Sequence, residues 1–533
     1  KGAVKGTVTL GIGNEATAVG TAYALAKNDW LALAIRDSGA LLVRGVSAKT
    51  IIAEACGRMD GITKGWDSSF HPGSQELRTM GINISHLGTI AGVVVGAAYA
   101  DRYHESNSLA LAFSGDGATS TGDIHETLNL ASVLHIPFVL VIENNQWAFG
   151  TPNCLEFAVP TLALRSLGYG GEGYLVDGTN VLAVYNTIQR AAVFARTQAT
   201  CCIVEARTMR MFGHSLADPF ETYIPRAQLD AWKEKDPLAS YRHGLMHAGI
   251  ADENTLNEIQ SLADAEIAEA ERAAVLSPFP NGSSVVTAAR ALLQRHCAAA
   301  AIPKTKLQGG HLTYHAAISL ALKEALENNP DCFIIGEDIA YSGGAFKITQ
   351  GLAEAFDGLD REAFATNPAS YRQRRVLDSP IAEAAMCEFA IGAAWVGLTA
   401  IVEFQYADFS SEAFKALVNL AASMPIRGMG PLRVVFRMPS GWSPGTGPFH
   451  SVNPESWFCS TPGLKIVAPI TAYDAIGLFR SAVCDGNPVI YCEYKAHYRK
   501  RPESLPIELN IPVPSEYYRI PIGKARTLKE GNL

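Results

Sequence analysis

The sequence predicts an α/β protein with two parallel sheets flanked by helices, and three observations support this prediction. Short apolar runs alternate with helical patterns in two separate regions, as expected for strand–helix–strand units. Hydrophobic residues make up 48% of the 533 residues and charged residues 18%, which provides apolar surface for large cores. Between the two regions, an acidic, alanine-rich stretch without glycine at 252–276 predicts one long helix, which the segment 277–282 ends.

Each alternating region contributes a set of short apolar runs that we interpret as buried strands. In the first region, strands are predicted at 108–114, 137–142 and 201–206, with a helix at 123–134. In the second region, strands are predicted at 332–335, 399–404, 432–436, 465–467 and 489–493, and a closing strand and turn at 520–533. We therefore expect a first domain at 1–245, a helical linker at 246–306, a second domain at 307–505, and the start of a third domain at 506–533.

Composition narrows the cellular setting and the classes of partner. The net charge of −8 favours neither a nucleic acid nor an anionic membrane as a partner. The ten cysteines include no CxxC pair, so neither a disulfide framework nor a zinc site is expected. The longest uncharged run in the most apolar region, at 389–402, is shorter than the ~20 residues that cross a bilayer. We expect a cytoplasmic protein. The chain starts at Lys1 and both ends look internal, so we expect a longer gene product, and a mitochondrial matrix location stays open.

The strongest motif is Gly115-Asp116-Gly117, which follows a predicted strand, with Asn144-Asn145 at the end of the next strand. Glycines at a strand end let the backbone approach a diphosphate, and the next helix presents N–H groups to it. Asp116, the amide oxygen of Asn145 and the backbone carbonyl of Trp147 offer three oxygen ligands, which suits Mg²⁺. The alternative is a tight turn followed by an asparagine-rich loop.

The residues around this motif carry a family resemblance. The segment GDGATSTGDIHETLNLASVLHIPFVLVIENNQWAFGTP contains the thiamine diphosphate signature and resembles the α chain of the decarboxylating component of 2-oxo acid dehydrogenase complexes. The resemblance continues in VDGTNVLAVYN, EARTMRMFGHSLADP and LAIRDSGALLVRG. It implies that Gly115, Asp116, Gly117, Asn145 and Trp147 bind the cofactor and Mg²⁺. It also implies that His214 lies on the diphosphate and substrate side, and that Arg36 contacts the diphosphate, although Ile35 replaces the family's aromatic residue.

The second region resembles the β chain of the same family through three segments, IIGEDIAYSGGAFKITQGL, VLDSPIAEAAMCEFAIGAAWVGLTAIVEFQYADFSSEAF and GPFHSVNPESWF. This resemblance implies that Glu383 hydrogen-bonds the aminopyrimidine of thiamine diphosphate, with Glu337 and Tyr406 nearby and His450 on the substrate side. The two resemblances together imply a fused α–β chain that forms at least a homodimer. They imply two thiamine diphosphate-binding domains, and that the third domain, which starts at 506–533, is transketolase-like. They also imply a 2-oxo acid substrate and a separate lipoyl acyltransferase as partner.

The residue types fit this chemistry, and each has a simpler alternative. Apolar neighbours of Glu383 would raise its pKa, so that it can hold a proton on the pyrimidine nitrogen of a cofactor that supplies its own carbanion. The alternative for Glu383 is a glutamate that favours the start of a helix. His214 and His450 follow strands in loops, where acid–base histidines occur, and the alternative for both is an exposed or core-satisfied histidine.

Two other enzyme classes, and an inactive protein, compete with this interpretation. The segment 11–16 follows the run at 8–10, which we interpret as a strand, and resembles a dinucleotide fingerprint. IRDSG, however, is a poor match for the acid expected about 20 residues later in an NAD-binding fold. An acyloin-forming carboligase is the closer alternative, since the chain has no lipoyl-like segment of its own. An inactive protein of this fold would lack Asp116, Asn145 or Glu383, and all three are present.

Departures from the family leave the substrate open. Thr9 stands where pyruvate-specific relatives often have histidine, and Val452 replaces a glutamine that usually follows His-Ser. Ile90 replaces a glutamine that helps to hold a monovalent ion in branched-chain relatives, so a K⁺ site stays open. The segments IRDSG and VDGTNVLAVYN favour a branched-chain substrate over pyruvate.

Overall fold

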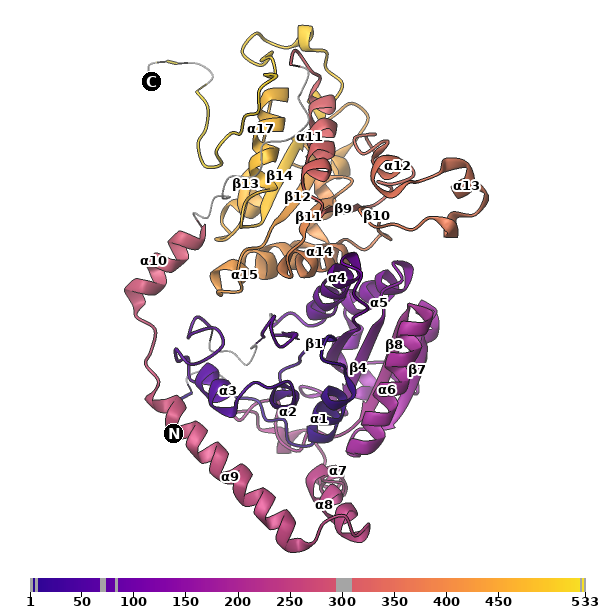
Figure 1. The fold of residues 1–533 in the computed structure, drawn as a ribbon, viewed down its shortest axis with the longest axis vertical. Coiled ribbons are helices and arrows are strands. Elements are labelled where there is room, and N and C mark those ends of the chain that lie inside the picture. Colours follow the sequence, from indigo (N-terminus) through magenta and orange to yellow (C-terminus); the bar gives the residue numbers. More distant parts are fainter. Residues whose placement is uncertain are drawn as a thin grey trace. The chain divides into compact units, whose positions relative to one another are not determined.

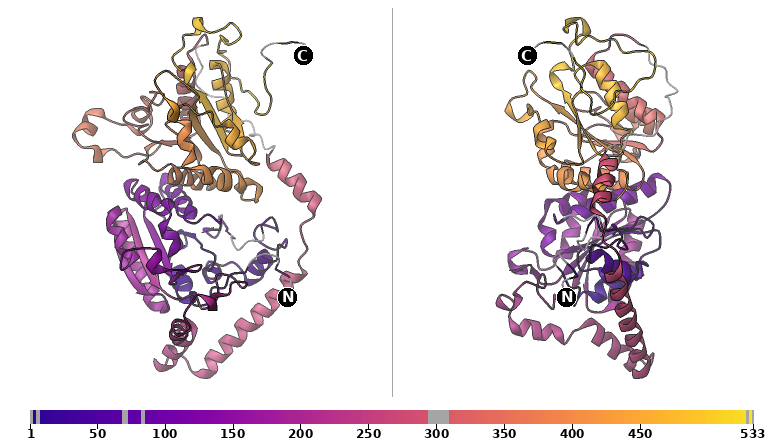
Figure 2. Two further views of the ribbon diagram at one scale, coloured as in Figure 1. Left: turned by 180° about the vertical axis from the view of Figure 1, so that it is seen from behind. Right: turned by 90° about the vertical axis from the view of Figure 1, so that its left-hand side faces the viewer.

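The chain folds into two compact units, Lys1–Ala288 and Ala289–Leu533, in a computed structural model that describes residues 3–4, 8–67, 73–81, 85–293, 309–527 and 530–531. Each unit contains one six-stranded sheet in which every pair of neighbouring strands is parallel, with helices on both faces (Figures 1 and 2). The predicted α/β class with two parallel sheets is therefore confirmed. The division between the units falls within 246–306, the segment expected to be a linker.

The sheet of the first unit has the strand order β2-β1-β3-β4-β8-β7. Its strands are β1 (Trp30–Ala32), β2 (Thr79–Met80), β3 (Ala110–Gly115), β4 (Phe138–Asn144), β7 (Glu172–Asp177) and β8 (Cys201–Arg207), and β5 (Trp147–Ala148) pairs with β6 (Thr151–Pro152) outside it. Its helices are α1 (Glu15–Ala24), α2 (Ser38–Val43), α3 (Ala48–Ala55), α4 (Thr89–Tyr103), α5 (Gly122–Val133) and α6 (Val181–Gln198). The central strands β3, β4 and β8 match the three predicted strands, because their residues are buried on both faces and form continuous apolar runs.

Four further helices follow the first sheet. They are α7 (Arg226–Lys233), α8 (Pro237–His247), α9 (Glu253–Leu276) and α10 (Gly282–Leu293). The long helix predicted at 252–276 is confirmed as α9, which Asp252 caps by accepting a hydrogen bond from the backbone N–H of Thr255 (2.8 Å). Part of α9 packs against α3, and α9 belongs to the first unit.

The sheet of the second unit has the strand order β10-β9-β11-β12-β14-β13. Its strands are β9 (Cys332–Gly336), β10 (Val376–Asp378), β11 (Thr399–Glu403), β12 (Val434–Ser440), β13 (Lys465–Val467) and β14 (Val489–Tyr494). Its helices are α11 (Tyr314–Asn328), α12 (Leu352–Asp357), α13 (Arg361–Thr366), α14 (Glu383–Trp395), α15 (Ser423–Ile426), α16 (Glu455–Cys459) and α17 (Ala472–Ala482). All five strands predicted for this region are present, and one core joins α11 and α17 to one face of the sheet.

Two predicted strands are wrong. The run at 8–10 forms no strand, because its polar groups bond to loop residues. The N–H of Leu216 donates to the carbonyl of Val8 (3.0 Å), the Thr9 hydroxyl donates to the carbonyl of Ile35 (3.2 Å), and Arg36 donates to the carbonyl of Leu10 (2.8 Å). The described residues of 506–533 likewise contain no strand of a third domain. Ile520 instead packs along α17, where its N–H donates to the carbonyl of Gly477 (3.1 Å). In the described part of the chain, no helix is long and apolar enough to span a membrane.

Replacing Arg437 with methionine is expected to destabilise the second unit by about 3–5 kcal/mol. Arg437 is fully buried in β12, where it donates twice to Glu493 (2.8 and 2.7 Å) and once to Glu403. Without the guanidinium, both carboxyl groups would stay buried and lose their cation. Urea unfolding followed by circular dichroism measures the loss, with the exposed Arg499→Met as a matched control. A loss below about 1 kcal/mol would show that the triad contributes little.

Candidate functional site

The two sheets each bring functional candidates to the edge where their strands end. In the first unit, β3 ends at Gly115, β4 at Asn144 and β8 at Arg207, and these three strands are neighbours. Asp116, Asn145 and the loop that contains His214 therefore begin at one sheet edge, as the motif spacing predicts.

Asp116 is the central acid of this edge and is 2% exposed. Its Oδ1 accepts a hydrogen bond from the N–H of Gly117 (2.9 Å), whereas its Oδ2 is buried with no hydrogen-bond partner in the described structure. Burial raises the pKa of Asp116 to about 6, and the charge of Glu156 acts in the same direction. A buried carboxylate oxygen without a partner is costly, and a bound cation would satisfy it.

The other two predicted metal ligands lie next to Asp116 in the fold. Asn145 and Trp147 are both buried, after β4 and in β5 respectively. Oδ1 of Asn145 accepts a long hydrogen bond from the N–H of Trp147 (3.3 Å). The carbonyl of Trp147 accepts another from Arg210 (3.4 Å). One carboxylate, one amide and one carbonyl oxygen form a hard donor set that fits Mg²⁺. The described residues contain no cluster of three or more His, Cys, Asp or Glu side chains that could hold a metal.

The glycines beside Asp116 fit the approach of a ligand. A Cβ on Gly117 would collide with the Cβ of Ala148, so glycine is required there for packing. A Cβ on Gly115 would meet no described heavy atom within 4 Å, which indicates open space beside the end of β3. The residues present therefore fit a diphosphate and Mg²⁺ at this edge.

Arg36 is buried and organises two loops in the structure. It donates to the carbonyls of Leu10 (2.8 Å) and His214 (2.9 Å), so it ties the segment before α1 to the loop after β8. Burial lowers the pKa of Arg36, and the nearby charge of Arg210 lowers it further. Its predicted contact with a diphosphate stays a prediction.

His214 lies in the loop after β8, as predicted, and its ring packs against Phe149 with centroids 4.7 Å apart. Its backbone N–H donates to Asp218 (2.5 Å). Burial lowers the pKa of His214, followed by the charges of Arg36 and Arg210. The imidazole is therefore held in its neutral form, in which a ring nitrogen can accept a proton.

Sequence reasoning missed the residue that shapes this loop, Arg210. Its guanidinium is fully buried and donates to the carbonyls of Phe212 (3.1 Å) and Phe149 (2.7 Å), and to the hydroxyl of Tyr223 (2.8 Å). It therefore joins the loop after β4 to the loop after β8. The signal was available in EARTMRMFGHS, where a charged residue stands in an otherwise apolar stretch that continues a buried strand.

A buried carboxyl pair beside Arg36 was also missed. Asp37 and Glu143 are 1% and 2% exposed, and they lie close enough for the charge of Asp37 to act on Glu143. Burial raises the pKa of both groups, and the charge of Asp37 raises that of Glu143 further. Since two adjacent buried carboxylates cannot both be charged at low cost, the pair holds a proton.

In the second unit, Glu337 and Glu383 come together from separate elements. Glu337 follows the last residue of β9 and is 6% exposed, with a buried Oε1 that lacks a hydrogen-bond partner in the described structure. Burial raises the pKa of Glu337 to about 7, and the charges of Glu383 and Asp338 raise it further. Glu383 therefore lies close enough for its charge to favour the protonated form of Glu337.

Glu383 is the first residue of α14, as its interpretation as a helix-start glutamate predicts. The N-terminal end of a helix stabilises a carboxylate and would lower its pKa. Burial instead raises the pKa of Glu383, and the charge of Glu412 adds to the effect. The surroundings of Glu383 therefore favour proton binding, which a helix-start role alone does not require.

Tyr406 and His450 also come together in the second unit. Tyr406 lies after β11, and its ring centroid is 4.4 Å from that of His450 in an edge-on contact. Phe409 packs against both rings, and the Lys495 Nζ lies 5.6 Å from the Tyr406 ring centroid. Burial lowers the pKa of Lys495 to about 8. The structure thus brings together the four candidates of this unit as two pairs, Glu337 with Glu383 and Tyr406 with His450. The remaining histidines include His71, which lies outside the described residues.

The raised pKa of Glu337 predicts a pH dependence of stability. Between its ordinary value of 4.5 and about 7, the folded unit binds more protons at this group than the unfolded chain does, so the free energy of unfolding should fall as pH rises through this window. Urea unfolding at pH 5, 6, 7 and 8 measures the slope. We expect Glu337→Gln to flatten it, with the exposed Glu516→Gln as control. An unchanged slope in Glu337→Gln would contradict the assignment.

Comparison with known proteins gives matches to both units. The family described as "Dehydrogenase E1 component" matches residues 1–282, and the family "Transketolase, pyrimidine binding domain" matches residues 311–501. The α-like part is 36% identical over 252 residues to the 3-methyl-2-oxobutanoate dehydrogenase subunit alpha of Mycobacterium tuberculosis, which covers 47% of this chain and 66% of that protein. It is 32% identical over 287 residues to the pyruvate dehydrogenase E1 component subunit alpha of Rhizobium meliloti, covering 54% of this chain and 82% of that protein.

The second unit has its own relative. It is 37% identical over 223 residues to the 2-oxoisovalerate dehydrogenase subunit beta of Bacillus subtilis, which covers 42% of this chain and 61% of that protein. The chain thus spans slightly less than two thirds of the mycobacterial alpha subunit and of the Bacillus beta subunit. One chain combines segments that are similar to an alpha and to a beta subunit.

Proposed function

Because the chain belongs to the dehydrogenase E1 component family, we propose that it catalyses the thiamine diphosphate- and Mg²⁺-dependent oxidative decarboxylation of a 2-oxo acid. The acyl group passes to the lipoamide of a partner acyltransferase. The observation that carries this proposal is the buried, unsatisfied Oδ2 of Asp116 beside open space at Gly115.

In this proposal, the first unit holds the diphosphate and the metal. Asp116, Asn145 and Trp147 supply three oxygens to Mg²⁺, and Gly115 and Gly117 let the backbone approach the diphosphate. Arg36 contacts the diphosphate, and His214 lies on the diphosphate and substrate side of the cofactor. The cationic Arg36 suits a diphosphate, and its two hydrogen bonds to loop carbonyls would fix the loop of His214 around it.

The second unit holds the pyrimidine. When bound, thiamine diphosphate supplies the carbanion that adds to the 2-oxo acid and takes up electrons as carbon dioxide leaves. Glu383 holds a proton at the pyrimidine nitrogen, a role that its raised pKa supports. Glu337, whose pKa is raised by the charge of Glu383, is the second acid beside the pyrimidine, and Tyr406 and His450 line the cofactor and substrate side. His214, with its lowered pKa, is available as a base toward the substrate.

The substrate is a branched-chain 2-oxo acid in our proposal. Relatives of both the branched-chain and the pyruvate type match the chain, so the choice rests on the segments IRDSG and VDGTNVLAVYN and on Thr9, which replaces the histidine frequent in pyruvate-specific relatives. Ile90 is buried in α4 and has no side-chain oxygen, so we assign no residue to K⁺.

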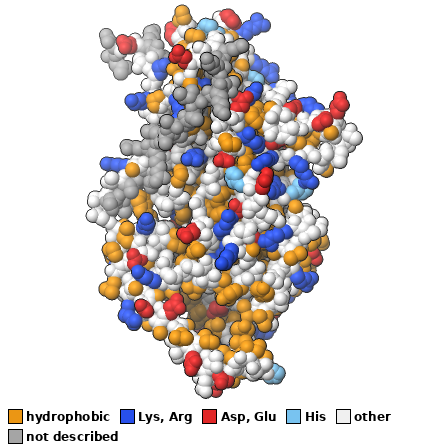
Figure 3. All heavy atoms as spheres, viewed as in Figure 1, with side chains coloured by type: hydrophobic (Ala, Val, Ile, Leu, Met, Phe, Trp, Pro, Cys, Tyr) orange, Lys and Arg blue, Asp and Glu red, His pale blue; other side chains and the backbone are white. Residues whose placement is uncertain are grey.

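The cofactor requires both halves, and we propose that the protein acts at least as a homodimer in the cytoplasm. Exposed apolar side chains gather on α8 and α9, over the end of the first unit that these helices form (Figure 3). Leu238 of α8, Leu262 of α9 and Ile250 between the two helices are each more than 60% exposed. A second copy would remove such side chains from water.

Acyloin formation is the second candidate, because the chain itself contains no lipoyl-like segment. An NAD-dependent oxidoreductase is disfavoured, because residues 8–10 do not form the strand that a dinucleotide fingerprint must follow.

The experiment supplies the protein with thiamine diphosphate, Mg²⁺ and 2-oxoisovalerate, pyruvate or an aromatic 2-oxo acid in parallel. One arm contains a lipoylated domain and the other an aldehyde acceptor. We expect acylation of the lipoyl domain, fastest with 2-oxoisovalerate. Rapid acyloin formation without lipoyl acylation would overturn the dehydrogenase assignment in favour of the carboligase.

A further inference from the structure

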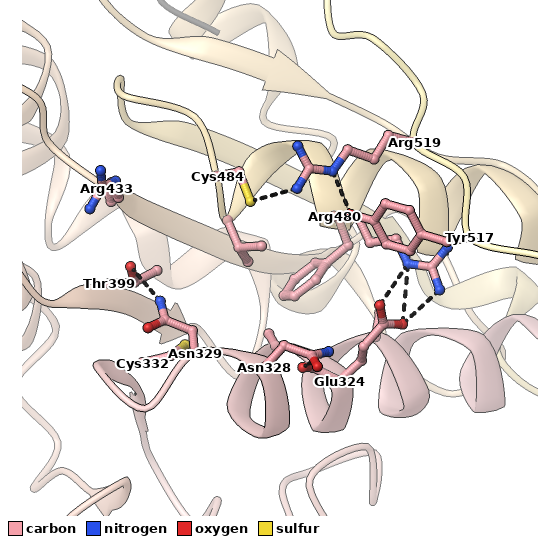
Figure 4. Close-up of a pocket in the computed structure, with 14 residues that line it drawn as sticks. Glu324, Asn328, Asn329, Cys332, Thr399, Arg433, Arg480, Cys484, Tyr517 and Arg519 are labelled. Atoms are coloured by element: carbon pink, nitrogen blue, oxygen red, sulfur yellow. Dashed lines mark hydrogen bonds and ion pairs between the residues drawn. The ribbon is translucent and has the colours of Figure 1, made fainter. Parts of the chain in front are cut away.

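A cavity of about 230 Å³ opens in the second unit, at the sheet edge where the strands begin. Cys332 and Thr399 line it as the first residues of β9 and β11, and Arg433 directly precedes β12 (Figure 4). Glu337 and Tyr406 follow the last residues of β9 and β11, at the opposite edge. The cavity is therefore separate from the proposed cofactor site of this unit.

The interior of the cavity is apolar. Ala321 and Ala325 of α11 line it together with Phe479 and Val483 from α17 and the residue after its end. An apolar cavity of about 150 Å³ is enough to bind benzene. This size suits a ligand with one ring or one branched chain and is too small for a nucleotide.

The polar lining has an excess of positive charge. It contains three arginines, Arg433, Arg480 and Arg519, and one acid, Glu324. Glu324 accepts three hydrogen bonds from Arg480 (2.8–3.1 Å), and both residues are buried. This pair therefore balances its own charge, and two further arginine charges border the cavity.

These two arginines lie at different ends of the cavity. Figure 4 shows Arg433 at one end and Arg519 at the other, beside Tyr517 and Cys484. Arg519 donates to the Tyr517 hydroxyl (2.5 Å) and to the Cys484 sulfur (3.2 Å), which fixes its guanidinium. The Tyr517 ring in turn lies 4.5 Å from the guanidinium carbon of Arg480. A fixed guanidinium next to an aromatic ring is suited to a carboxylate on an apolar body.

The two arginines are not needed to bind the free carbonyls at the C-terminal end of α11. The carbonyls at and after the end of α11 accept hydrogen bonds from Arg375, which donates to Leu326 (2.7 Å), Asn329 (2.8 Å) and Cys332 (3.1 Å). Arg375 therefore already satisfies the partial negative charge at the end of α11.

We propose that this cavity binds a small organic acid, whose single ring or branched apolar body fills the cavity and whose carboxylate is held by Arg519, with Arg433 at the far end. The proposal does not rest on the proposed enzymatic function, and it concerns the opposite edge of the sheet. A ligand there leaves the cofactor site accessible.

The Cys484 thiol provides a direct readout, because it is half-buried in the cavity lining. The whole chain is alkylated with iodoacetamide, and modification of each cysteine is followed by mass spectrometry. Benzoate is the probe, benzamide is its neutral analogue of the same shape, and the salt concentration is held constant. The exposed Cys154 and Cys459 serve as internal controls.

We expect benzoate to slow the alkylation of Cys484 with half-protection in the millimolar range, as a ligand of this size allows. The rates at Cys154 and Cys459 should not change. Benzamide should require ~10-fold more for the same protection, since it lacks the charge that pairs with arginine. Arg519→Gln should raise the half-protecting benzoate concentration by ~10-fold, and Arg499→Gln, which does not line the cavity, should leave it unchanged.

Arg433→Gln is the second variant and should weaken protection by a smaller factor. It replaces Arg519→Gln in the test if circular dichroism shows that Arg519→Gln does not fold. Three results would overturn the proposal: no protection of Cys484 by benzoate, equal protection by benzamide, or unchanged protection in the variant that folds.

Discussion

Removal of the Asp116 carboxylate, in Asp116→Ala, is expected to abolish the Mg²⁺-dependent binding of thiamine diphosphate. Asp116 provides the one charged oxygen of the proposed ligand set, and its buried Oδ2 has no hydrogen-bond partner in the described structure. Loss of an outer-shell partner typically costs ~10–100-fold in metal affinity, so loss of the ligand itself should cost more than ~100-fold. Isothermal titration calorimetry with and without Mg²⁺ measures the effect.

Two further variants separate metal binding from loop structure. Asp116→Asn retains an oxygen that can accept from the N–H of Gly117, but it removes the charge, so it should keep the turn and still lose most of the Mg²⁺ dependence. Asp230→Ala, on the exposed face of α7, should bind as the parent protein does. Unchanged Mg²⁺-dependent affinity in Asp116→Ala would disprove the metal assignment.

Strands could be predicted from the sequence where both of their faces are buried. The central strands β3, β4, β8, β9 and β11 are buried on both faces, so their residues form uninterrupted apolar runs that can be recognised without a structure. Short or peripheral strands such as β1, β2, β7 and β10 carry too few residues or too mixed a pattern, and they were not predicted. The strand expected at 8–10 was wrong, because the polar groups of this run form hydrogen bonds with loop residues and not with a neighbouring strand.

For the site, local motifs were predictable and long-range pairs were not. Asp116 and Asn145 follow successive buried strands, so their approach results from the topology of a parallel sheet. The pairing of Asp37 with Glu143, by contrast, joins residues whose local sequences show no sign of each other. The same holds for Arg210, whose partners lie on two loops. Such contacts depend on how loops fold back, which hydrophobic periodicity does not encode.

Glu383→Gln is expected to leave the cofactor bound and to slow its activation. The side-chain amide is nearly the same size as the carboxyl group but cannot hold a titratable proton at the pyrimidine nitrogen. Loss of an acid–base group typically costs ~10²–10⁴-fold, so the exchange of the thiazolium carbon proton for deuterium should slow by this factor. Rapid quench followed by NMR measures the exchange, and calorimetry measures cofactor affinity on the same samples.

The control for this variant is Glu362→Gln, which changes another glutamate in a first helical turn, in the exposed helix α13. If Glu383 served only the start of α14, both substitutions would have small effects on stability and none on exchange. The raised pKa of Glu383 argues for a different result, because burial there favours the protonated carboxyl that the exchange reaction requires. Normal exchange in Glu383→Gln with normal cofactor affinity would reduce Glu383 to a structural residue. It would also leave Glu337, buried nearby with its own raised pKa, as the remaining acid at this sheet edge.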